Sequence, residues 1–215
     1  MNNIALTPNA PQYWEILYEE GMDEWDLGEA TPALLDFFKH PSCPEKGNIL
    51  VPAAGRGWDA EAWARRGHNV VAVDFCSSAF DALEKLSDNN SNLTALNADM
   101  FLLNLHNGKA SLEQFDIIYD YFGFNSVHPG RRDECVEMWL RMLKDDGLLI
   151  GFFCPLCGEK YGEGPPYSIS KEELEVRFNG MLEIKERIVP KKSVKDRAGR
   201  DRTGREEIWL LRKIL

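Results

Sequence analysis

Two glycines and an alanine follow a short apolar run in the first third of the chain, in the segment Gly55-x-Gly57-x-x-Ala60. Glycine allows the backbone to turn tightly and to approach a ligand at the carboxyl edge of a parallel sheet, which is where open α/β sheets bind small molecules. The same spacing also occurs in a plain turn from a strand to a helix. The segment therefore indicates a candidate nucleotide site, and its context has to decide between the two interpretations.

Two acidic residues stand where later strands are expected to end. Asp74 comes nineteen residues after Gly55, where a carboxylate can accept hydrogen bonds from both ribose hydroxyls of an adenosine. Asp99 precedes Met100 and Phe101, so it could accept a hydrogen bond from an adenine amino group while its apolar neighbours pack on the ring. The alternatives are a helix cap for Asp74 and a turn acid for Asp99. Sites at three successive strand ends favour one shared ligand.

Aromatic residues follow the end of a fourth expected strand. Asp120 is the last residue of that strand, and Tyr121, Phe122 and Phe124 come directly after it. Aromatic rings attract a cation through the negative potential of their faces, so rings at this place would surround a sulfonium group. The alternative is that these residues belong to the ordinary hydrophobic core.

The elements that must position these residues alternate between strand and helix. Three stretches between the first five apolar runs suit helices, at 59–66, 78–86 and 131–143. Such alternation implies right-handed crossovers and a parallel sheet that is covered on both faces. The expected strands are 48–52, 69–74, 93–97, 115–120, 148–154, 181–189 and 206–213.

The last two expected strands break this alternation, because only a polar segment joins them, and we expect them to form an antiparallel pair. A mostly parallel, seven-stranded, doubly wound α/β sheet that ends in an antiparallel hairpin is Rossmann-like and resembles the topology of class I methyltransferases. Residues 1–47 are rich in aromatics and suit helices at 11–20 and 32–39. We expect a single domain, 1–215, with residues 1–47 as a helical cap or lid over the cofactor and residues 48–215 as the sheet core.

The composition limits the kind of partner. The chain has 215 residues, of which 44% are apolar and 28% charged, which is typical of one globular domain. Its 25 basic and 35 acidic residues give a net charge of −10, which repels nucleic acids and anionic lipids. No apolar run reaches the roughly 18–20 residues of a bilayer span. We expect a cytoplasmic, monomeric protein that acts on a small molecule and binds neither nucleic acid nor a membrane.

Several motifs in order resemble the thiopurine S-methyltransferase superfamily, and most closely its plant-type halide/thiol methyltransferases. The resemblance covers roughly residues 11–190, and the tryptophan-rich start is its most specific part. The motifs are Tyr13-Trp14-Glu15, Gly21, Trp25-Asp26-Leu27-Gly28-Glu29-Ala30-Thr31-Pro32, Leu50-Val51-Pro52 through Gly57-Trp58-Asp59, the acids Asp74 and Asp99, the pair Asp120-Tyr121, and Gly164-Pro165-Pro166-Tyr167.

The resemblance implies a methyltransferase that uses S-adenosyl-L-methionine and methylates a small soft nucleophile such as a thiol, thiocyanate or a halide. Tyr121 and Tyr167 are expected near the methyl acceptor, as positioning or polarising groups. Methyl transfer to oxygen or nitrogen of a metabolite, and a non-catalytic module that binds adenosine cofactors, are the alternatives. The residues expected to bind the cofactor are Trp14, Tyr18, Trp25, Ala53, Gly55, Gly57, Asp74, Phe75, Asp99, Met100, Phe101, Asp120 and Tyr121.

Two features depart from that family pattern, and a cysteine pair needs a separate interpretation. Ala53 stands where the family usually has a glycine. The basic stretch 191–205 is most simply a solvated hairpin loop, and the sharper interpretation is a charged gate that attracts an anionic acceptor. Cys154 and Cys157 form a single Cys-x-x-Cys pair without a second pair or clustered histidines, so we expect no metal site and a strand end that enters an active-site loop at 155–166.

Overall fold

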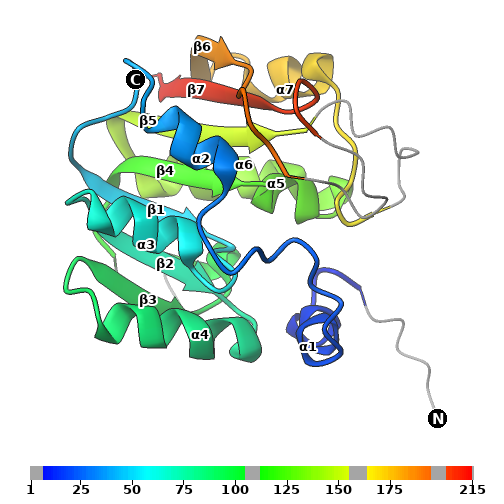
Figure 1. Cartoon of the computed structure of the whole chain (residues 1–215). Coiled ribbons are helices and arrows are strands. Elements are labelled where there is room, and N and C mark those ends of the chain that lie inside the picture. Colours follow the sequence, from blue (N-terminus) through cyan, green and yellow to red (C-terminus); the bar gives the residue numbers. More distant parts are fainter. Residues whose placement is uncertain (1–6, 105–111, 155–163, 195–201, 215) are drawn as a thin grey trace.

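Seven strands form one open sheet whose first five members are parallel (Figure 1). The structure is a computed structural model, and it describes residues 7–104, 112–154, 164–194 and 202–214. The strand order is β3-β2-β1-β4-β5-β7-β6, and β7 pairs antiparallel with both β5 and β6. The strands are β1 Asn48–Pro52, β2 Asn69–Asp74, β3 Leu93–Asn97, β4 Phe115–Tyr121, β5 Leu143–Phe153, β6 Leu182–Ile188 and β7 Glu207–Lys213. The fold expected from the sequence is confirmed.

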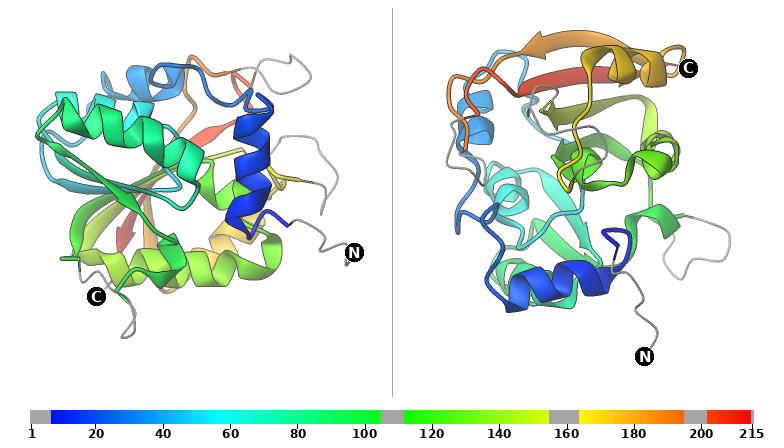
Figure 2. Two further views of the ribbon diagram at one scale, coloured as in Figure 1. Left: turned by 90° about the horizontal axis from the view of Figure 1, so that it is seen from below. Right: turned by 90° about the vertical axis from the view of Figure 1, so that its right-hand side faces the viewer.

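Helices cover both faces of the sheet because successive strand side chains point to opposite sides. On β1, Ile49 and Val51 pack with α2 (Pro32–Phe37) and α3 (Trp58–Arg65) in one hydrophobic cluster. Leu50, between them, packs with α6 (Arg132–Met142) and α7 (Lys171–Phe178) in a second cluster. The sheet is therefore the middle of three layers, and Figure 2 shows these layers from two further sides.

α4 (Ser77–Asp88) packs on β2 and β3 on the same side as α3, and its Leu83 belongs to the first cluster. The other helices lie close to the carboxyl ends of the parallel strands and are α1 (Pro11–Glu19), the short α5 (Gly123–Ser126) and two 3-10 turns, η1 (Met100–Leu102) and η2 (Pro129–Arg131). Among the described residues, no helix is long and apolar enough to cross a bilayer.

The amino-terminal segment divides into two parts with different packing. α1 contains no buried residue and lies beside α4 at the carboxyl edge of the sheet (Figures 1 and 2). α2 buries Ala33, Leu34 and Phe37 in the first hydrophobic cluster, so it packs as a core helix. The lid hypothesis therefore concerns α1 and the chain up to Gly28, while α2 contributes to the sheet core.

Two elements differ from the sequence-based expectations. β5 begins at Leu143, directly after α6, and not at the expected residue 148. Leu143 pairs with Phe115, and a bulge separates this pair from the regular pairing that resumes at Leu148. α7 was not expected, although Ser170 caps it by accepting a hydrogen bond from the amide of Glu173, which is the spacing of a capping box. Of the expected active-site loop, residues 155–163, including Cys157, lie outside the described part of the chain.

Candidate functional site

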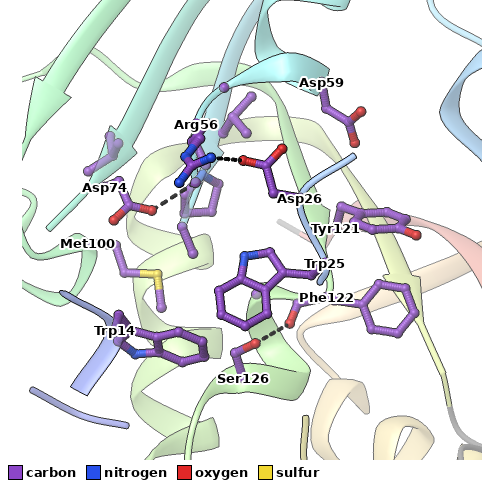
Figure 3. A pocket seen from close by; sticks show the side chains of 18 of the residues that line it. Trp14, Trp25, Asp26, Arg56, Asp59, Asp74, Met100, Tyr121, Phe122 and Ser126 are labelled. Carbon is purple, nitrogen blue, oxygen red and sulfur yellow. Dashed lines mark hydrogen bonds and ion pairs between the residues drawn. The ribbon is translucent and has the colours of Figure 1, made fainter. Parts of the chain in front are cut away.

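A cavity of about 260 Å³ opens at the carboxyl edge of the sheet, above β1, β2 and β4 (Figure 3). Open α/β sheets bind ligands at this edge, because the chain leaves successive strands toward opposite faces there. Its walls come from the strand ends, from α1 and the segment that follows it, and from two described residues of the basic stretch, Val194 and Arg202. The expected cofactor residues that line it are Trp14, Tyr18, Trp25, Ala53, Gly55, Gly57, Asp74, Phe75, Asp99, Met100, Phe101 and Tyr121.

The glycine loop is shaped by backbone conformations that larger residues would strain. Gly55 has φ of 56° and Gly57 has φ of 89°. A Cβ atom at Gly57 would lie 2.3 Å from Cδ1 of Leu83, so glycine is required for α3 to start against α4. Ala53, with φ of 48°, holds the same left-handed conformation without being glycine.

Asp74 is held at the end of β2 with its carboxylate in the cavity wall. The backbone amides of Gly55 and Cys76 donate to its two oxygens at 2.8 and 2.9 Å. Burial raises the pKa of Asp74 to about 6, although both hydrogen bonds act in the opposite direction. The N-cap residue of α4, Cys76, makes no side-chain cap. Through its two amide donors, Asp74 connects the glycine loop to the start of α4, and its carboxylate retains lone pairs for a ligand.

Asp99 caps a turn, as one of its two interpretations predicts, and it also stands in the cavity wall. Its Oδ1 accepts a hydrogen bond from the amide of Phe101 at 2.9 Å and thereby caps the turn η1. Asp99, Met100 and Phe101 nevertheless all line the cavity. The Arg131 guanidinium lies 3.8 Å from the centre of the Phe101 ring, which fixes the outer face of this wall.

Three aromatic side chains from the amino-terminal segment close the opposite wall. The Trp25 ring meets the Trp14 and Tyr18 rings edge to face, with centroids 5.7 and 5.6 Å apart. The Arg56 guanidinium lies 5.0 Å from the centre of the Tyr18 ring. Trp14 and Trp25 thus line the same cavity as Asp74 and Met100 (Figure 3).

Two acidic residues, Asp26 and Asp59, join this segment to the glycine loop and to the start of α3. Asp26 accepts a hydrogen bond from Nε1 of Trp58 at 2.8 Å and pairs with Arg56 at 3.1 Å. Asp59, half-buried in the cavity wall, accepts hydrogen bonds from Thr31 and from the Tyr119 hydroxyl, the latter at 2.6 Å. The position of Asp26 inside the tryptophan-rich motif could have indicated its role at the site. No local pattern could have indicated the contact of Asp59 with Tyr119, because the two residues are sixty positions apart in the sequence.

The far end of the cavity is aromatic and contains one basic side chain from the expected gate. Tyr121 and Phe122 lie together beyond Trp25 in Figure 3. The buried Tyr121 hydroxyl has no hydrogen-bond partner within the described chain, and burial raises its pKa well above the usual value. Arg202 lies 4.9 Å from the centre of the Phe122 ring and lines the same cavity.

Three expected site residues do not reach the cavity. Phe124 is fully buried in the second hydrophobic cluster, where its ring stacks on Trp139 with centroids 5.0 Å apart, so it belongs to the core. The buried carboxyl of Asp120 accepts a hydrogen bond from the amide of Phe124 at 3.1 Å, which supports the start of α5, and burial raises its pKa to about 7. The Tyr167 ring packs edge-on against His128 at 5.5 Å, while its neighbours Pro165 and Pro166 line the cavity. Both acid and tyrosine therefore support the site from outside its walls.

The sheet order and the place of the cavity define a class I methyltransferase fold, and solved structures of that class resemble it. The *Burkholderia thailandensis* 1,6-didemethyltoxoflavin-N1-methyltransferase, solved with S-adenosylhomocysteine, gives a TM-score of 0.71 at 17% identity over 100% of this chain and 94% of the other. The magnesium protoporphyrin IX methyltransferase from *Synechocystis*, solved with S-adenosylmethionine, gives 0.69 at 11% identity over 99% and 100%. At these identities the likeness concerns the fold.

The chain belongs to the thiopurine S-methyltransferase family, whose model matches residues 9–213. Members of this family depend on S-adenosylmethionine, so a methyltransferase and its expected cofactor are confirmed. A probable thiol methyltransferase 2 from *Arabidopsis thaliana* is 33% identical over 79% of this chain and 73% of its own length. Thiocyanate methyltransferase 1 from *Brassica oleracea* is 32% identical over 73% and 67%, and a thiopurine S-methyltransferase from *Legionella pneumophila* is 28% identical over 82% and 84%.

Proposed function

We propose that this protein transfers a methyl group from S-adenosylmethionine to a small soft nucleophile, namely a thiol, thiocyanate or a halide. The observation that carries the proposal is the division of one cavity into two ends. Acids and tryptophans line one end, and Tyr121, Phe122 and Arg202 line the other. Relatives named as thiol and thiocyanate methyltransferases support the same acceptor class.

The residues at the first end fit the cofactor by their chemistry. Asp74 offers carboxylate oxygens to ribose hydroxyls, and Asp99 stands beside the apolar side chains of Met100 and Phe101, which suits an adenine ring. The rings of Trp14 and Trp25 suit a cationic sulfonium centre. When bound, S-adenosylmethionine supplies an electrophilic methyl group, and the protein contributes alignment and exclusion of water.

At the second end, the side chains favour an acceptor that ionises by itself. The Tyr121 hydroxyl keeps its proton at neutral pH, because burial raises its pKa, so it acts as a hydrogen-bond donor rather than as a base. No histidine lines the described part of the cavity. A thiol with an ordinary pKa near ~8.5 is already partly thiolate at neutral pH and needs only weak assistance.

Arg202 supports the interpretation of the basic stretch as a gate for anions. Within the described residues no carboxylate pairs with its guanidinium, which stacks on Phe122 in the cavity wall. The other two arginines of the cavity are paired, Arg56 with Asp23 and Asp26, and Arg131 with Glu134. Arg202 is thus available to attract a thiolate, thiocyanate or iodide ion.

A series of acceptors tests this proposal, with release of S-adenosylhomocysteine as the readout. We expect faster turnover with hydrosulfide, a small thiol, iodide and thiocyanate than with a catechol or an amine, and thiol rates that rise with pH as the thiolate fraction grows. Arg202→Gln should raise KM for thiocyanate severalfold, while Lys192→Gln, at an exposed position of the same basic stretch, should not. Efficient methylation of an amine or phenol with inert sulfur and halide acceptors would move the assignment to an N- or O-methyltransferase. Cofactor binding without turnover of any acceptor would indicate the non-catalytic module.

A further inference from the structure

The attachment of α1 to the rest of the protein depends on few contacts. No residue of α1 is buried, so the helix is not held by a hydrophobic core of its own. Its main neighbour is α4, whose first turn lies next to it at the edge of the cavity (Figure 2). α1 nevertheless supplies Trp14 and Tyr18 to the cavity wall. A specific polar contact must therefore fix its position.

Glu15 provides that contact. Its carboxylate accepts hydrogen bonds from the Ser78 amide at 3.1 Å, from the Ser78 hydroxyl at 2.8 Å and from the Cys76 thiol at 2.7 Å. The N-cap residue of α4 makes no side-chain cap of its own, so Glu15 caps α4 from another helix. The negative charge also lies at the positive end of the α4 dipole.

The same short segment connects Glu15 to the residue proposed to bind the ribose. The Cys76 amide donates to Asp74 at 2.9 Å, while the Cys76 thiol donates to Glu15. Burial raises the pKa of this thiol to about 12, so it remains a neutral donor at physiological pH. Cys76 therefore joins two carboxylates, one on the wall of the cavity and one on the helix that covers it.

We infer that Glu15 is a positioning residue for the cofactor: by capping α4 it fixes α1 so that Trp14, Tyr18 and Asp74 face the bound S-adenosylmethionine together. This inference rests on the proposed function, because it takes the cavity between α1 and β2 to be the cofactor site. The acceptor end, around Tyr121, lies on another part of the cavity and makes no contact with Glu15. Glu15 should consequently affect the cofactor and leave the acceptor unaffected.

The test compares Glu15→Ala with Glu19→Ala, a matched control one turn later in the same helix, whose side chain is exposed. Isothermal titration with S-adenosylmethionine should give a Kd about tenfold higher for Glu15→Ala, the effect of losing charge-assisted hydrogen bonds, and an unchanged Kd for Glu19→Ala. KM for the acceptor should stay within about twofold of the wild type, because Glu15 does not reach that end. S-adenosylhomocysteine should protect the chain after α1 from limited proteolysis in the wild type, and less so in Glu15→Ala.

Other results would indicate that Glu15 has a purely structural role, that helix propensity causes the effect, or that the cavity does not bind the cofactor. A normal Kd in Glu15→Ala, even with a lower melting temperature, would mean that Glu15 only stabilises the fold and would overturn the inference. An equal rise in Glu19→Ala would assign the effect to helix propensity and would overturn it too. If Glu15→Ala does not fold, Ser78→Ala removes one donor to the same carboxylate and should raise Kd about threefold, and an unchanged Kd would be decisive against the inference. Failure of the wild type to bind S-adenosylmethionine would instead overturn the proposed function.

Discussion

At the scale of single residues, the chemistry of the site follows from how its acids are held. The Asp74 carboxylate is buried and receives two backbone amides, which fix its orientation before any ligand arrives. Pre-set acceptors of this kind lose little entropy when a ligand binds. Tyr121 shows the opposite arrangement, because its buried hydroxyl lacks a partner within the described chain. A buried donor without a partner is costly, so a ligand at this place would relieve the cost.

Replacing Asp74 by alanine should weaken cofactor binding by more than about tenfold, because acceptors for both ribose hydroxyls are lost and hydrogen bonds to a charged group contribute about 1.5–3 kcal/mol. Isothermal titration with S-adenosylmethionine measures this, with circular dichroism to show that the variant folds. Asp81→Ala, an exposed acid on α4, is the control and should bind normally. Unchanged affinity in a folded Asp74→Ala variant would contradict the ribose assignment.

Cofactor binding should also depend on pH through Asp74. Its pKa is about 6 in the folded protein, and donors from a ribose favour the ionised carboxylate, so protonation opposes binding. The Kd for S-adenosylhomocysteine should therefore be about tenfold higher at pH 5 than at pH 7. Asp74→Asn should bind weakly at both pH values and lose most of this dependence. An equally steep profile in Asp74→Asn would assign the titration to another group.

The same pKa has the opposite effect on the stability of the ligand-free protein. A folded pKa of about 6, above the ordinary value of 3.8, means that the folded state holds the proton more tightly than the unfolded state. The contribution of Asp74 to the free energy of unfolding is thus present below about pH 4 and is lost as the pH rises through 6. The stabilisation gained by adding cofactor should grow as the pH rises from about 4 to 6. The effect of pH on cofactor binding can therefore be distinguished from its effect on the stability of the ligand-free protein.

At the scale of elements, each part of the site depends on how one segment is attached to the sheet. α1 and the chain up to Gly28 are attached by polar and aromatic contacts, whereas α2 is attached by burial of Ala33, Leu34 and Phe37. Polar attachments at the surface open at lower cost than apolar ones in a core. The first part is therefore suited to move during binding, and the second is not.

Deletion of residues 1–28 should abolish cofactor binding and activity, and should leave a protein that unfolds cooperatively. The deleted part supplies Trp14, Tyr18 and Trp25 to the cavity but no residue to either core cluster. Thermal denaturation followed by circular dichroism, together with titration of cofactor, measures both effects. A truncated chain without a cooperative transition would show that this segment is required for folding and would refute the lid hypothesis.

The segment before α7 is held by one buried arginine. Arg132 on α6 pairs with Glu173 at 2.7 Å and donates to the carbonyl oxygens of Tyr167 and Ser168. Arg132→Ala should lower the free energy of unfolding by about 3 kcal/mol, because it removes three hydrogen bonds of a fully buried guanidinium and leaves the Ser168 carbonyl oxygen without this donor, whereas Asn125 and Arg177 still donate to Tyr167 and Glu173. Arg65→Ala, which removes an exposed pair with Glu61, should cost less than about 1 kcal/mol. Equal losses in urea titrations of both variants would contradict this account.

At the scale of the whole molecule, the charge decides which partners can approach. The net charge is −10, and the described cavity nevertheless contains a cationic side chain, Arg202, at one end. A local cation in an acidic protein attracts small ions over a few ångströms, within the screening length of about 8 Å at physiological salt. Extended polyanions meet the repulsion of the whole surface instead.

We expect the protein to sediment as a monomer of 24.5 kDa at micromolar concentration, because its charge opposes self-association. Analytical ultracentrifugation measures the mass, and fluorescence anisotropy with a labelled DNA duplex should give no binding at physiological salt. A dimer that persists at low concentration, or a DNA complex, would contradict the expected absence of macromolecular partners.

The sequence by itself determined the sheet and the position of the cavity, because both depend on local patterns. Strand and helix periodicity gave the order of elements, since alternating apolar side chains must be buried on both faces of a parallel sheet. Gly57, Asp74 and Asp99 were predictable because each stands at a strand end or a few residues after one, and strand ends of a parallel sheet meet at one edge. α7 was not predicted, although the spacing of Ser170 and Glu173 is that of a capping box and indicates the start of a helix.

The tertiary structure alone decided which neighbours of those residues reach the cavity. Asp120 and Tyr167 belong to motifs of the family, yet one supports α5 and the other packs on His128, because the direction of a side chain depends on elements far away in sequence. Arg202 and Glu15 gain their places through contacts with Phe122 and Ser78, eighty and sixty-three residues away. Such long-range contacts follow from the packing of the whole chain, so spacing alone does not determine them.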